Sequence, residues 1–149
     1  QYKVFDISKN ILINKTQFDS SLNDVAFNPG VWRMLFRRSS IRDIRFPQFK
    51  MAEDQNFLST LSLPEKNYSF SNSIFYTYYV GNFGQLTSQK SAVNEILDGA
   101  RFTLTKLKNS NVAAHGFNTT LFSRQIITGV KKGSSRVKIG CLFLFFKAY

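Results

Sequence analysis

The stretch Asn28–Leu58, NPGVWRMLFRRSSIRDIRFPQFKMAEDQNFL, holds the clearest succession of local structural signals in the chain. Its opening Asn-Pro-Gly triplet is a strong turn sequence. Beyond it apolar and basic residues alternate, so that Trp32, Met34 and Phe36 fall on one side, which is the pattern of a strand with one face toward a core. A Phe-Pro pair at 46–47 then breaks the pattern. The stretch is therefore predicted to run as a turn, a strand and a loop before its acidic end.

The acidic end of this stretch opens a predicted helix over residues 52–62. Phe57 and Leu58 recur with a later leucine at helical spacing, which predicts one face buried in the core. Glu53 and Asp54 occupy the first turn, where the helix dipole favours carboxylates. An isolated pair of this kind is usually an ordinary solvated helix start, so its meaning depends on the surrounding residues.

Segments on either side complete a pattern of strands and helices. Short strands are predicted at 2–7 and 11–13 and within the β-branched and aromatic segment 68–80. Residues 88–109 follow the helical period, and a second amphipathic segment covers 119–132. We therefore expect an α/β fold with a small mixed sheet and flanking helices.

The charge distribution of the chain is uneven. Its 149 residues include 20 Lys or Arg against 9 Asp or Glu, a net charge of +11, and no acidic residue lies between Gly99 and Tyr149. This balance favours anionic partners such as nucleotide phosphates, nucleic acid or acidic lipid headgroups. With one cysteine, Cys141, and one histidine, His115, the composition fits a reducing cytoplasmic setting and argues against a disulfide framework or a histidine-rich zinc site.

The apolar run Ile139–Phe146, IGCLFLFF, lies within the basic C-terminal segment. It is too short to span a membrane, which takes about 20 residues. Two interpretations stay open. The run is either a buried strand or helix end, or part of a basic, aromatic tail that contacts an anionic cytoplasmic leaflet.

Several elements of the chain occur in one order. They are Trp32 in the predicted strand, a Phe-Arg-Arg-Ser turn at 36–39, Phe46, the segment Glu-Asp-Gln-Asn-Phe at 53–57, and the Tyr-rich segment TYYVGNFGQLT at 77–87. A short acidic motif alone would carry little weight. The ordered series resembles the family 2 glycosyltransferases of the GT-A fold, although a glutamine in the last segment stands where the family more often has serine.

The resemblance implies both a fold and an activity. Residues 1–110 would form the acceptor-side, C-terminal part of a GT-A-like domain, and residues 111–149 a basic, aromatic extension. The implied activity is transfer of a sugar, with inversion, from a nucleotide-diphosphate sugar to a glycan or lipid-linked acceptor. The implied location is the cytoplasm, with a peripheral position on the cytoplasmic face of the membrane.

The resemblance also implies a catalytic base. Inverting transfer needs a group that takes the proton from the attacking acceptor hydroxyl. In the family the Asp of the Glu-Asp pair has this role, so the resemblance assigns it to Asp54, with Glu53 as a neighbour that holds the acceptor or tunes Asp54. Two adjacent buried carboxylates would raise one another's pKa, which favours a working base.

Trp32, Arg37 and Arg38 are the candidate substrate-binding residues. Trp32 can stack on an acceptor sugar or pack as a core residue of a half-buried strand. Arg37 and Arg38 can grip a phosphate of the donor or acceptor bidentately, or form part of a solvated basic face.

The chain lacks the family's donor-binding signature. In that family an Asp-x-Asp motif binds a divalent cation that bridges the diphosphate, and no Asp-x-Asp triplet occurs here. The resemblance therefore implies a magnesium or manganese ion whose ligands are not in this chain, and a nucleotide-binding half upstream of it. No residue of the chain is assigned as a metal ligand.

Two other functions fit the composition. A basic chain with 15% aromatic residues suits a nucleic-acid-binding module with stacking platforms, but no RNP-like signature, helix-turn-helix turn or zinc-binding pattern is present. A non-catalytic domain derived from a transferase would keep the same sequence pattern without turnover.

Overall fold

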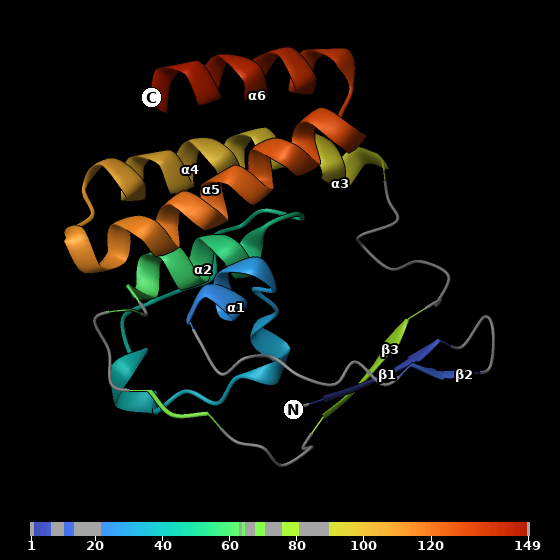
Figure 1. The fold of residues 1–149 in the computed structure, drawn as a ribbon, viewed down its shortest axis with the longest axis vertical. Coiled ribbons are helices and arrows are strands. Elements are labelled where there is room, and N and C mark those ends of the chain that lie inside the picture. Colours follow the sequence, from blue (N-terminus) through green and yellow to red (C-terminus); the bar gives the residue numbers. More distant parts are fainter. Residues whose placement is uncertain are drawn as a thin grey trace.

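Helices account for most of the structure. The computed structural model describes residues 2–6, 11–13, 22–62, 64, 68–70, 76–80 and 90–148. Its helices are α1 (Leu22–Phe27), η1 (Val31–Arg33), η2 (Arg38–Ser40), α2 (Glu53–Leu61), α3 (Lys90–Asn94), α4 (Ile96–Lys108), α5 (Val112–Lys132) and α6 (Ser135–Ala148), where η marks a 3-10 helix. Its strands are β1 (Tyr2–Asp6), β2 (Ile11–Ile13) and β3 (Tyr76–Val80). In Figure 1 the long helices α4, α5 and α6 lie on one another, and the strands lie to one side.

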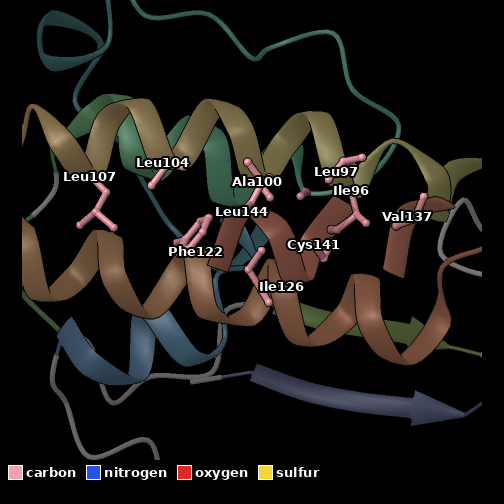
Figure 2. Packing of buried hydrophobic residues seen from close by; sticks show 11 residues of the cluster. Ile96, Leu97, Ala100, Leu104, Leu107, Phe122, Ile126, Val137, Cys141 and Leu144 are labelled. Atoms are coloured by element: carbon pink, nitrogen blue, oxygen red, sulfur yellow. The ribbon is translucent and has the colours of Figure 1, made fainter. Parts of the chain in front are cut away.

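The larger hydrophobic core lies between α4, α5 and α6 (Figure 2). Apart from Ala52, which precedes α2, its members are the periodic apolar residues of α4 and the residues of α5 and α6 that face them. They include Ile96, Leu97, Ala100, Leu104, Leu107, Phe122, Ile126, Val137, Cys141 and Leu144. Helices α5 and α6 approach closely at Gly129, where a Cβ atom would lie 2.4 Å from the Cys141 Sγ atom. The absence of a side chain at this position therefore permits the crossing.

A second hydrophobic cluster joins α2 to α1 and α5. Phe57, Leu58 and Leu61 of α2 are buried in it together with Phe117 and Leu121 of α5. Apolar side chains from the loop before α2 pack against its edge. This cluster fixes α2 on the body of the molecule, as its predicted apolar face requires.

The three strands form one small sheet in the order β2-β1-β3. Strand β1 is antiparallel to β2, with Val4 opposite Ile13, and parallel to β3, with Val4 opposite Tyr78. The predicted strands near 2–7 and 11–13 are confirmed, and that within 68–80 is confirmed for β3, while residues 71–75 lie outside the described part of the chain.

The predicted α/β part-domain of the GT-A type is wrong. The described residues are mainly helical, and their core forms between packed helices instead of between a mixed sheet and flanking helices. The physical reason is that the segment predicted to be an extension contains α5 (Val112–Lys132) and α6 (Ser135–Ala148), and these helices supply one side of the core. The domain boundary at 110/111 stays a prediction.

The predicted strand after the Asn-Pro-Gly turn is also wrong. The turn itself is present, but residues 31–40 form η1, an extended link and η2. The alternation still has a meaning, because Met34 and Phe36 pack against the α2 cluster while Leu35 is 89% exposed. An extended link alternates its side chains as a strand does, whether or not another strand pairs with it.

The predicted helices at 52–62 and 88–109 are confirmed where the structure describes them, although a turn at Glu95 divides the second into α3 and α4. The segment predicted from 119 belongs to a helix that begins at Val112, where the Ala114 N–H donates to the Asn111 side chain at 3.0 Å. That bond is a typical helix N-cap. The apolar run at 139–146 lies within α6. No helix in the described ranges is long and apolar enough to cross a membrane.

Candidate functional site

Asp54 lies in the first turn of α2 and is tied to the loop before it. The Val31 N–H donates to its Oδ2 atom at 3.2 Å, so the carboxylate caps the start of η1. Ala52, immediately before α2, has the left-handed backbone angle φ 69°. This conformation is strained for a residue with a Cβ, and such strain is concentrated at functional sites. The acidic pair therefore opens α2, directly after a buried residue with a left-handed backbone conformation.

Burial raises the pKa of both acids. It raises the pKa of Asp54 above its ordinary value, although the hydrogen bond from Val31 opposes this change. Burial also raises the pKa of Glu53; a backbone hydrogen bond opposes that effect, and the neighbouring charge of Asp54 adds to it. The charge of Asp54 thus helps to raise the pKa of Glu53, as expected for two adjacent acids. Burial raises this pKa more than the charge does.

An open, mainly apolar hollow of about 380 Å³ lies beside this helix start. It is lined by Val31, Trp32, Met34, Phe36, Ile41, Ile44, Arg45, Phe46 and Phe57. The ring of Phe46 stacks on that of Phe57 with a centroid distance of 4.2 Å, and Phe36 meets Phe57 edge-on at 5.5 Å. These contacts hold the three phenylalanine rings against one another in the lining of the hollow.

The predicted site residues are only partly brought together. Trp32 lines the hollow, and its ring lies 5.1 Å from that of Tyr76 on β3. Asp54 is not among the lining residues and reaches the hollow through its bond to Val31. Arg37 and Arg38, at the start of η2, are exposed and lie outside the lining.

Arg45 is the cationic side chain that the structure places in the hollow instead. Its Nη1 atom donates to the carbonyl oxygens of Arg42 at 2.6 Å and Ile44 at 3.0 Å, which hold the guanidinium in place. The sequence patterns assigned no role to Arg45. The available signal in the sequence was its position next to Phe46, which also lines the hollow.

A buried polar group behind α2 was also missed. Thr103 of α4 and Gln125 of α5 both donate to the Oδ1 atom of Asn56, at 2.7 and 2.9 Å. All three side chains are buried. The bonds link α2 to α4 and α5 and so set the position of the helix that carries Glu53 and Asp54. Residues spread over three helices leave no local pattern in a sequence.

Metal ligands do not gather around the acidic pair. Across the described ranges, no group of three or more His, Cys, Asp or Glu side chains is arranged to hold a metal ion. Comparison with known proteins adds no relative: no protein-family model, curated protein or solved structure matches the chain.

Proposed function

We propose that the chain is the acceptor-side half of a glycosyltransferase that moves a sugar, with inversion, from a nucleotide-diphosphate sugar to a glycan or lipid-linked acceptor. The observation that carries the proposal is the setting of Asp54. It is a carboxylate with a raised pKa, fixed at a helix start and bonded to a residue that lines an aromatic hollow. The proposal rests on this site and on the ordered motifs, because a fold alone does not define a function.

Asp54 is proposed as the general base. A base works best when its pKa is moved toward the working pH, and burial moves that of Asp54 in this direction. The bond from Val31 engages Oδ2 and orients the carboxylate. In this proposal the acceptor hydroxyl approaches past Val31, and Glu53 holds a second acceptor hydroxyl or tunes Asp54.

The hollow is proposed as the acceptor site. Aromatic walls with a few placed polar groups are typical of small-molecule sites. Trp32 and Phe46 offer ring faces to the apolar side of a sugar, and Arg45 offers N–H donors to its hydroxyls or to an acceptor phosphate. Arg37 and Arg38 are proposed to meet phosphates outside the hollow.

The donor is proposed to be held by a nucleotide-binding half elsewhere, together with a magnesium or manganese ion, because the chain has no Asp-x-Asp triplet. The proposed location is the cytoplasm, with the protein peripheral on the membrane.

The direct test is a transfer assay with the nucleotide-binding half supplied. Asp54→Asn should lower the transfer rate by about 100-fold or more, since general-base catalysis contributes roughly 10²–10⁴. Glu53→Gln, a matched change one residue away, should keep a larger share of the activity. A folded Asp54→Asn protein with the wild-type rate would refute the assignment.

Acceptor binding can be measured separately because Trp32 is the chain's single tryptophan. Its fluorescence reports directly on the hollow, so titration with oligosaccharides should change the emission and saturate. Phe46→Ala should weaken this binding, whereas Leu35→Ser, at an exposed position outside the hollow, should not. Binding of single-stranded nucleic acid with the same spectral change, and none with oligosaccharides, would favour the nucleic-acid alternative.

A further inference from the structure

Helix α6 has two apolar faces, and only one of them is covered. Val137, Cys141 and Leu144 are buried against α4 and α5. Figure 1 shows α6 as the outermost helix, with its other side turned away from the molecule. A helix at the surface of a soluble domain normally presents polar residues on that side.

The uncovered side is instead apolar. We define the outer face of α6 as Ile139, Leu142, Phe143 and Phe146, which are 69%, 47%, 68% and 76% exposed. Residues of a helix are about 100° apart around its axis, so these four occupy one continuous arc opposite Cys141. Four large apolar side chains that are exposed side by side mark an interaction surface.

Cations border the outer face on both sides. At the same angular spacing, Arg136 and Lys147 adjoin the arc beside Phe143, and Lys138 adjoins it beside Leu142. All three are exposed. An apolar stripe between two basic edges is the arrangement of a helix that lies in a membrane interface, with the stripe in the acyl boundary and the cations at the headgroups.

We propose that the outer face of α6 binds the surface of an anionic lipid bilayer, with the helix lying in the plane of the interface. The charge pattern favours this partner over a second copy of the chain. Two copies joined through this face would bring like charges together, and residues 99–149 contain no Asp or Glu to compensate them. A bilayer with acidic headgroups complements both the stripe and its edges. This inference specifies the surface for the proposed membrane location, and it does not depend on sugar transfer.

Vesicle co-flotation of the 149-residue chain tests the proposal. Vesicles of phosphatidylcholine with phosphatidylserine should bind the chain, and vesicles of phosphatidylcholine alone should bind it far less. The double variant Phe143→Ser, Phe146→Ser should lower binding to the anionic vesicles by at least about tenfold. Its control is Leu35→Ser, Val112→Ser, which removes two even more exposed apolar side chains from other surfaces and should leave binding unchanged.

A second pair of variants distinguishes binding through the outer face of α6 from non-specific attraction by the net positive charge of the chain. Lys138→Gln, Lys147→Gln should lower binding by about 30-fold, because each cation near an acidic leaflet contributes to the affinity. Arg42→Gln, Lys50→Gln removes the same charge from exposed positions outside α6 and should have little effect. Equal losses in the two pairs would overturn the proposal in favour of non-specific attraction.

Two other outcomes would also overturn it. One is the absence of binding to the anionic vesicles by a chain whose circular dichroism shows the expected helices. The other is a dimer in light scattering that Phe143→Ser, Phe146→Ser converts to a monomer while vesicle binding is unaffected. The vesicle assay contains no sugar donor, so its result is independent of any failure of the transfer assay.

Discussion

The crossing of α5 over α6 allows a sharp test of the helical core. A Cβ atom at Gly129 would lie 2.4 Å from the Cys141 Sγ atom and 3.2 Å from the Ile96 Cγ2 atom. Both neighbours are buried, so neither can move into solvent. Overpacking of this kind costs about 1–3 kcal/mol, against which alanine gains about 1 kcal/mol over glycine inside a helix. A contact this short belongs at the upper end, so Gly129→Ala should lower the free energy of unfolding by about 2 kcal/mol.

The same helix supplies the control. Gly116 is exposed in α5, and a Cβ there would meet nothing within 4 Å. Gly116→Ala should therefore stabilise the protein by up to about 1 kcal/mol through helix propensity alone. The two variants make the same chemical change in one helix, and the structure predicts opposite signs.

Removal of the Cys141 Sγ atom should restore part of the stability that Gly129→Ala loses. In a double-mutant cycle, Cys141→Ala should recover about 1–2 kcal/mol of the loss caused by Gly129→Ala, because the Sγ atom is the nearest obstacle. Urea denaturation followed by far-UV circular dichroism gives all four unfolding free energies. If Gly129→Ala is as stable as Gly116→Ala, or if Cys141→Ala gives no rescue, the packing of α5 on α6 described above is incorrect.

Further predictions concern the site and its support. Phe57→Ala should cost about 3–5 kcal/mol of unfolding free energy because Phe57 is buried, and Phe46→Ala should cost clearly less because Phe46 is half exposed; urea denaturation compares them. Thr103→Val keeps the side-chain shape but removes the donor to Asn56, and should cost about 1–2 kcal/mol in the same assay; an unchanged midpoint would exclude the buried network. Burial raises the pKa of Asp54 in the folded protein above its ordinary 3.8, so the stability linked to its proton is present below that pH and lost as the pH rises through the raised pKa. Unfolding measured against pH should therefore show Asp54→Asn gaining stability relative to wild type over this interval, and parallel curves would argue against a buried carboxylate.

Local patterns in the sequence identify most of the regular elements. The period of Ile96, Leu97, Ala100 and Leu104 is sufficient to predict α4, because one helix face carries all of them into the core. The helix start at α2 is equally visible in its acidic first turn. The break at Glu95 is not visible, because the same period continues across it.

Long-range packing is what the sequence patterns do not contain. The alternation after Asn28 suggested a strand, yet an extended link packed on α2 has the same pattern. The apolar run in α6 gave no period, because residues of both its faces are apolar, and periodicity separates only unlike faces. Both segments contribute to the error in fold class, together with the packing of α5 into the core.

The candidate site was only half predictable for the same reason. Glu53 and Asp54 stand together in the sequence and therefore in the structure. Their approach to Trp32, through Val31, and the ring of Tyr76 beside Trp32 depend on contacts between distant segments. The hollow lined by Val31 and Trp32 has no sequence signature of its own.

The pH dependence of sugar transfer tests the central claim most directly. If Asp54 is the base, the rate with the donor half supplied should rise with pH through a pKa above 3.8, level off once Asp54 is ionised, and lose this rising limb in Asp54→Asn. Glu53→Gln should keep the limb. A profile for Asp54→Asn that has the wild-type rate and the wild-type limb would contradict the account.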